Sequence, residues 1–198
     1  WAANTYAVTY NANGGSGTTA GQTKTYGVAL TLSDCGFTRA GYTFRYWNTK
    51  ADGTGTSYNA GASYTANAAV TLYAIWQVIT YAVSYNGNGA TGGATAAQTK
   101  TWGVSLALRS NGFARTGYAF TGWNTKADGS GTAYAAGASY TANAAVTLYA
   151  QWLRANIPVF VNALGEVRQV EKAYANVGGT VREVTVYANV GGVIKVIV

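Results

Sequence analysis

The stretch GYTFRYWNTKADGTGT at Gly41–Thr56 holds the features that decide the fold, and it returns as GYAFTGWNTKADGSGT at Gly117–Thr132. Each copy opens with aromatic residues at alternate positions, the pattern of a strand with one buried face. Each then passes through Trp-Asn-Thr-Lys into a run of Asp, Gly and Thr or Ser, which are residues that turns prefer. The stretch therefore predicts a strand that leads into a tight turn, built twice.

The repetition extends well beyond this stretch. Residues Gly36–Trp76 are identical to Gly112–Trp152 at 32 of 41 positions. Upstream, TYAVTYNANGG at Thr5 returns as TYAVSYNGNGA at Thr80. Self-similarity at a fixed period is the signature of repeat architectures. The sequence therefore predicts one folding unit present in two copies.

The repeat sets the domain organisation. We predict module 1 at residues 1–77, module 2 at residues 78–154 and a separate tail at residues 155–198. Trp1 stands four residues before its TYAV motif, as Trp76 does before the next one, so we expect Trp1 to be the end of an upstream copy. The tail repeats Tyr-Ala-Asn-Val-Gly-Gly between Val-rich runs. This pattern predicts a small C-terminal β-meander.

Alternation with a period of two dominates both modules, and no stretch longer than about two turns has helical periodicity. The fold class we predict is mainly β, with little helix. In module 1, the sets expected to share a face are Tyr6, Val8 and Tyr10; Val28, Leu30 and Leu32; Tyr42, Phe44 and Tyr46; and Val70, Leu72, Ala74 and Trp76.

The composition excludes several kinds of chemistry. The 198 residues include no His and a single Cys, so a Ser-His-Asp triad and an internal disulfide are impossible within the chain. Six acidic residues are too sparse for a typical calcium cage. We expect no catalytic residue, no cofactor and no metal, and we expect the chain not to be an enzyme.

The charge pattern bears on partners. Thirteen Lys and Arg residues against six acidic residues give a net charge of +7, but the positive charge is spread along the chain. Nucleic-acid binding proteins usually cluster their basic residues, so we expect no nucleic-acid partner. A run of about 18 apolar residues is also absent from the sequence, so we expect no membrane insertion. A weak attraction to anionic cell-surface polymers fits this charge better.

The Trp-Asn pair of each repeat is the first candidate site. Trp47 and Trp123 could offer a stacking platform to a glycan. The interpretation we favour is a core tryptophan beneath a turn whose backbone is bonded by Asn48 or Asn124, because the pair recurs at the same place in both copies. The residues that close the copies, Trp76 and Trp152, belong to the same structural motif.

The turn that follows contains Asp52-Gly-Thr-Gly or Asp128-Gly-Ser-Gly, a fragment of a calcium loop. One carboxylate per copy favours a Gly-rich hairpin turn instead. We expect an ion pair between Lys50 and Asp52 across this turn. The lone thiol, Cys35, aligns with Asn111, which favours a tolerated small residue over an intermolecular disulfide.

Two further segments are candidates for contact with other molecules. Tyr26 and Trp102 share one position before a Gly at a strand end, and we expect an exposed contact surface there. At the end of the chain, Val193, Ile194, Val196, Ile197 and Val198 form a strand with a single charge. This strand could close its own sheet, or it could add to the sheet of a neighbouring molecule.

Several spaced motifs carry a family resemblance: G-Y-x-F-x-x-W-N-T-K-A-D-G-x-G-T, Y-x-x-x-Y-N-x-N-G and V-T-L-Y-A-x-W, in order and twice. They resemble the Listeria–Bacteroides repeat, the family that includes the internalin B-repeat. The resemblance implies β-grasp-like modules in secreted, surface-attached bacterial proteins, where they serve as stalks and as adhesive or self-associating units. One departure is Tyr46, which replaces the usual small residue, present as Gly122 in module 2. The tail is similar to short repeats near the ends of phage tail and surface-fibre proteins.

Three functions stay open at this point. The first is an extracellular structural or adhesive repeat of a bacterial surface or filament protein, which associates with itself or with other surface proteins through multivalent contacts. The second is an adhesin for cell-surface polysaccharide, which would lose binding on Trp102→Ala. The third is a phage tail-fibre or receptor-binding segment.

Overall fold

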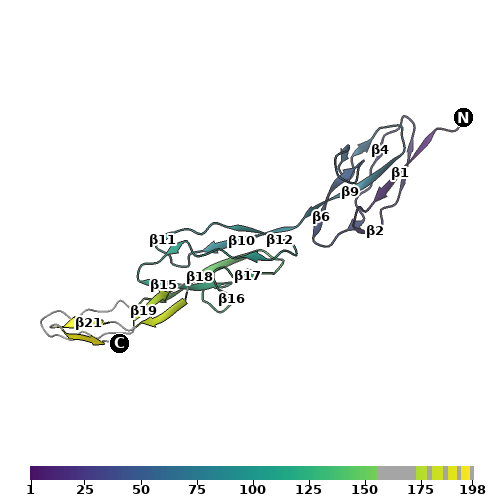
Figure 1. The fold of residues 1–198 in the computed structure, drawn as a ribbon. Helices are drawn as coiled ribbons and strands as arrows, with labels where there is room; N and C mark the ends of the chain where they lie inside the picture. Colours follow the sequence, from purple (N-terminus) through teal and green to yellow (C-terminus); the bar gives the residue numbers. More distant parts are fainter. Residues whose placement is uncertain (156–172, 178–179, 185–186, 191–192, 197–198) are drawn as a thin grey trace. The chain divides into compact units, whose positions relative to one another are not determined.

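The computed structural model describes residues 1–155 and, in the tail, residues 173–177, 180–184, 187–190 and 193–196. Every regular element in these ranges is a strand, which confirms the mainly-β prediction (Figure 1). The chain divides into two compact units. The first contains Trp1–Thr80 and Thr101–Gly103, and the second contains Tyr81–Lys100 and Val104–Val198.

Module 1 is built on a five-stranded sheet with the order β3-β1-β9-β6-β7. The central strand β9 runs parallel to its neighbour β1, with Val8 opposite Val70 and Asn11 opposite Tyr73. The other pairings in the sheet are antiparallel. The strands are β1 (Thr5–Asn11), β3 (Gln22–Thr25), β6 (Tyr42–Asn48), β7 (Ser57–Tyr58) and β9 (Val70–Val78). Two short ladders lie outside it, between β2 (Ser16–Gly17) and β5 (Phe37–Thr38) and between β4 (Leu30–Thr31) and β8 (Ser63–Tyr64).

Module 2 repeats this topology in the order β12-β10-β18-β15-β16. Its strands are β10 (Thr80–Asn86), β12 (Gln98–Thr101), β15 (Tyr118–Asn124), β16 (Ala133–Tyr134) and β18 (Val146–Arg154). The short ladders pair β11 (Gly92–Gly93) with β14 (Phe113–Ala114), and β13 (Leu106–Ala107) with β17 (Ser139–Tyr140). As in module 1, the central strand, here β18, is parallel to one neighbour, β10.

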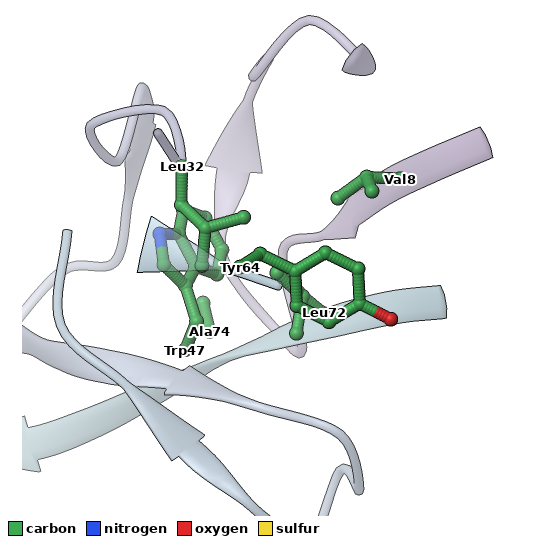
Figure 2. Close-up of a cluster of buried hydrophobic side chains, with 6 residues drawn as sticks. All are labelled: Val8, Leu32, Trp47, Tyr64, Leu72 and Ala74. Carbon is green, nitrogen blue, oxygen red and sulfur yellow. The ribbon is translucent and has the colours of Figure 1, made fainter. Parts of the chain in front are cut away.

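The core lies against one face of each sheet, as the alternation requires. Figure 2 shows the core of module 1, formed by Val8, Leu32, Trp47, Tyr64, Leu72 and Ala74. The rings of Tyr10 and Phe44 lie with their centroids 4.6 Å and 4.8 Å from that of Trp47. Buried aromatic residues each remove roughly 150–250 Å² from water, which stabilises a module of this small size. Module 2 buries Val83, Leu108, Trp123, Tyr140, Leu148 and Ala150 in the same way.

The strict alternation predicted for β6 is wrong at one point. The register against β9 shifts between Phe44 and Tyr46, a β-bulge that leaves one extra residue on β6. Beyond the bulge, Trp47 lies opposite the buried Ala74, while Tyr46 lies opposite Ile75. Trp47 therefore takes the core face, and Tyr46 moves to the other face of the sheet. β15 carries the same bulge, between Phe120 and Gly122.

The set Val28, Leu30 and Leu32 also departs from the prediction. Leu32 is buried, but Val28 is exposed because it belongs to a turn, where its amide donates to the carbonyl of Thr25 at 3.1 Å. The regular strand in this segment is limited to the two residues of β4, Leu30–Thr31.

The tail contains strands, as the sequence predicts. β19 (Ala173–Val177) pairs antiparallel with β20 (Thr180–Val184), and β21 (Tyr187–Val190) pairs antiparallel with β22 (Val193–Val196). Each pair forms its own two-stranded sheet, where the sequence predicts one continuous meander. Ile197 and Val198 of the strand-addition candidate lie outside the described residues.

Candidate functional site

The turn after β6 is organised by one buried side chain. The Nδ2 atom of Asn48 donates to the carbonyl oxygens of Gly53 and Gly55, both at 3.1 Å, and to Oγ of Ser57 at 3.0 Å. Its Oδ1 atom accepts from the amides of Lys50 at 2.8 Å and Gly55 at 3.0 Å. All four polar positions of the amide group are thus engaged in holding the turn. Asn124 makes the same four backbone bonds in the corresponding turn of module 2.

The four motif tryptophans are packed and bonded within their modules. Trp47 and Trp123 are fully buried, and their Nε1 atoms donate to the carbonyls of Ser33 and Arg109, both at 3.0 Å. A ring with no exposed face cannot stack on a glycan. Trp76 and Trp152 pack against the cores, and their Nε1 atoms donate to the carbonyls of Ala12 at 2.9 Å and Gly87 at 2.8 Å.

The turn that contains Asp52 is held by hydrogen bonds among its own residues. Asp52 accepts hydrogen bonds from the amide of Thr54 at 3.0 Å and from its hydroxyl at 2.8 Å, and these lower the pKa of the carboxyl. Lys50 adds only a weaker electrostatic contribution to that lowering, so hydrogen bonds rather than the expected ion pair dominate here. Among the described residues, no three His, Cys, Asp or Glu side chains come together in a group that could hold a metal ion.

An exposed apolar turn recurs in both modules, and it contains the two aromatic residues singled out in the sequence. Tyr26 is 60% exposed and Val28 is 59% exposed. At the matching positions of module 2, Trp102 is 38% and Val104 is 58% exposed. Each turn passes through a glycine with positive φ, 71° at Gly27 in module 1, a conformation that favours glycine. We call residues 25–28 and 101–104 the apolar turns.

A buried lysine holds each apolar turn, and sequence reasoning missed it. Lys24 is fully buried, and its Nζ atom donates to the carbonyl of Thr25 at 2.7 Å and to Oδ1 of Asn67 at 3.0 Å. The same Oδ1 accepts from the amide of Gly27 at 2.9 Å. Asn67 thus ties the turn to the loop before β9. The repeated QTKT and TANAA motifs were the available signal, because Lys100 bonds Asn143 equivalently at 3.1 Å.

The remaining candidates differ between the copies. Cys35 is partly buried, and burial raises the pKa of its thiol; its Sγ donates to the carbonyl of Phe37 at 3.6 Å. Asn111, at the same place in module 2, makes two bonds to Phe113, at 2.9 and 3.0 Å. In the tail, Val193, Ile194 and Val196 lie on β22, which has one edge paired with β21.

The doubled sheet, with its core tryptophan and its Asn-bonded turn, defines a tandem β-repeat protein. Residues 6–75 and 81–151 match the Listeria-Bacteroides repeat domain, which covers well over half of the chain. The chain therefore belongs to this family, which confirms the resemblance stated above.

Two relatives come from Evansella cellulosilytica. One, provisionally named a Gly-rich membrane protein, is 37% identical over 134 residues, which are 63% of this chain and 15% of that protein. The other, provisionally named a membrane protein, is 32% identical over 160 residues, which are 79% of this chain and 23% of that protein. The chain thus spans less than a quarter of either relative. In the part of the chain that the structure describes, no helix has the length and apolarity needed to cross a membrane.

Proposed function

We propose that the chain is a non-enzymatic structural and adhesive segment of a bacterial surface or filament protein, which acts by self-association and multivalent contacts outside the cell. The observation that carries this proposal is the apolar turn, present at the same place in both modules. Exposed apolar side chains that gather in one patch are typical of interaction sites, and each turn exposes two of them two residues apart. The relatives' names, which describe membrane proteins, support a location at the cell envelope.

The hydrogen bonds of Asn67 to Lys24 and to the Gly27 amide, which we call the clamp, support the same proposal. A contact loop that is already ordered loses little conformational entropy when it binds. Lys24 and Asn67 fix the turn in module 1 from below, while the Tyr26 ring stays exposed above it. Each turn alone offers a small apolar contact. Two or more per chain add their effects because, after the first contact, the second is intramolecular.

Sedimentation velocity over a concentration series tests self-association. We expect the wild-type chain to form larger species as its concentration rises. A quadruple variant without the exposed side chains of both apolar turns should stay monomeric over the same range. It carries Tyr26→Ser, Val28→Thr, Trp102→Ser and Val104→Thr. The matched control is Tyr118→Ser with Leu153→Thr, which removes exposed apolar side chains outside the apolar turns. A monomeric wild-type chain, or equal association of all three proteins, would contradict the proposal.

Binding of cell-surface polysaccharide is the second candidate, because the partly exposed Trp102 ring is of a kind that stacks on sugars. Retention of the chain on immobilised cell-wall polysaccharide, lost on Trp102→Ala and kept on Leu153→Ala, would favour it. Equal retention of both variants would refute a role for Trp102.

A further inference from the structure

At the bulge, which both modules share, the outer face of the sheet (the face away from the core) carries different residues in the two modules. In module 1, Tyr46 lies opposite Ile75 across the ladder. A Cβ atom placed on Gly53 would lie 3.9 Å from the Tyr46 hydroxyl and 3.7 Å from Cδ1 of Ile75. The Tyr46 ring therefore covers the outer face between β9 and the turn that Asn48 holds.

The same place in module 2 is hollow. The residues that correspond to Tyr46, Gly53 and Ile75 are Gly122, Gly129 and Gln151. All three line a hollow of about 370 Å³, together with Tyr134. Module 1 closes this position with its own phenol ring, and module 2 leaves it open. The two copies thus show both an empty site and the kind of group that fits it.

The hollow is built to stay open. Gly122 has φ 154°, and a Cβ atom there would lie 3.0 Å from the carbonyl oxygen of Tyr134, so a side chain at this position would be strained. The buried residues Trp123 and Asn124 also belong to its lining. Every lining residue is uncharged, which favours a neutral occupant. The rim carries the Gln151 amide, whose Nε2 atom makes only long bonds of 3.3 Å to the carbonyls of Lys126 and Tyr149.

We infer that this hollow receives an aromatic side chain from a second copy of the chain, and that the ring is that of Tyr26. The inference rests on the self-association proposed above and names its contact surfaces. Tyr26 carries the same phenol group that fills the matching place in module 1, and its ring is exposed on a clamped turn. Its hydroxyl would reach the turn at Gly129 and the Gln151 amide, as the Tyr46 hydroxyl reaches the turn at Gly53.

This contact has a consequence for assembly. The ring and the hollow are different surfaces of the chain, so each copy can give a ring to one neighbour and receive a ring from another. Head-to-tail contacts of this kind build open chains unless their rotation closes a ring. A symmetric dimer that buries Tyr26 against Tyr26 is the opposing arrangement.

The first test probes the hollow with p-cresol, the side-chain analogue of tyrosine, and does not depend on self-association. In a titration followed by ¹H–¹⁵N NMR of the full chain, we expect saturable shifts at Gly122, Gly129 and Gln151. The matching amides of Gly53 and Ile75 are the internal control and should stay in place, because Tyr46 already fills their site. Absence of saturable shifts in module 2, or equal shifts in both modules, would overturn the inference.

The second test assigns the ring. Thr121→Trp plugs the hollow from its rim, and Arg45→Trp is its matched control beside the filled site, since Arg45 already lies over the Tyr46 ring at 5.4 Å. Thr121→Trp and Tyr26→Ala should each weaken association by at least about tenfold, the effect of losing an aromatic contact at the centre of an interface. A mixture of these two variants should form a 1:1 complex, because one retains the ring and the other retains the hollow.

The outcomes separate this inference from the proposed function. If the wild-type chain associates and both variants associate equally well, the inference fails while the proposed function stands. If Tyr26→Ala weakens association but the mixture forms no complex, the Tyr26 ring binds elsewhere and the inference is likewise refuted. A wild-type chain that stays monomeric refutes both.

Discussion

Replacing Asn48 with alanine should destabilise module 1 by about 3 kcal/mol. The substitution removes five hydrogen bonds, four of them to the backbone of the turn between β6 and β7. A buried polar group left without a partner costs about 1–3 kcal/mol. Several such groups would be exposed at once, but the turn lies at the surface, where water can replace part of what is lost. The estimate is therefore well below the sum of the individual costs.

Native-state hydrogen exchange of the full chain measures this effect locally, because it gives an opening free energy for each amide. Amides of β6 and β9 should lose protection in Asn48→Ala, while those of module 2 serve as the internal reference. The control is Ser57→Ala, which removes only one of the five bonds and places the residue that module 2 has at Ala133. Its cost should be below about 1 kcal/mol. If Asn48→Ala costs no more than Ser57→Ala, the argument that this side chain holds the turn is wrong.

Three further predictions concern module 1. Asn67→Ala leaves the buried Nζ of Lys24 with one bond fewer and should cost about 2 kcal/mol in urea unfolding; an unchanged midpoint would count against the clamp. Cys35→Asn introduces the side chain that makes two bonds at Asn111, so it should raise stability by about 1 kcal/mol, and an unchanged or lower melting temperature would contradict this. Folding lowers the pKa of Asp52, so the contribution of this carboxylate to folding stability is complete above the unfolded pKa of about 3.9 and is lost as the pH falls through the folded pKa. An NMR titration that finds an ordinary pKa for Asp52 would refute this.

The parts of the fold that alternation controls could be predicted from the sequence. Val8 and Leu72 are fully buried, as their position in regular two-residue patterns requires. The bulge at Arg45 has no signal in module 1 itself, and strict alternation therefore puts Tyr46 on the wrong face; the signal lies in module 2, where Gly122 stands inside the strand at the Tyr46 position, as glycines at bulges often do. Exact repetition made the structural role of the Trp-Asn pair predictable, since the pair recurs together with its turn in both modules. It could not show the empty site in module 2, which arises from a difference between the copies.

The candidate site was predicted only in part. Exposure at the apolar turns could be expected from an aromatic residue followed by glycine. The burial of Lys24 could not, because charged residues are rarely fully buried and its partner Asn67 lies 43 residues further along the chain. Local patterns do not contain the pairing that brings such distant residues together.

The parallel pairing of β1 with β9 determines how each module would resist tension. The chain enters module 1 through β1 and leaves it through β9, and these two strands are direct neighbours that run in the same direction. A pull on the two ends would therefore slide one strand along the other and load their hydrogen bonds simultaneously. A hairpin pulled at its open end would instead unzip one bond at a time. Since β10 and β18 repeat the arrangement, each module should withstand stretching in shear.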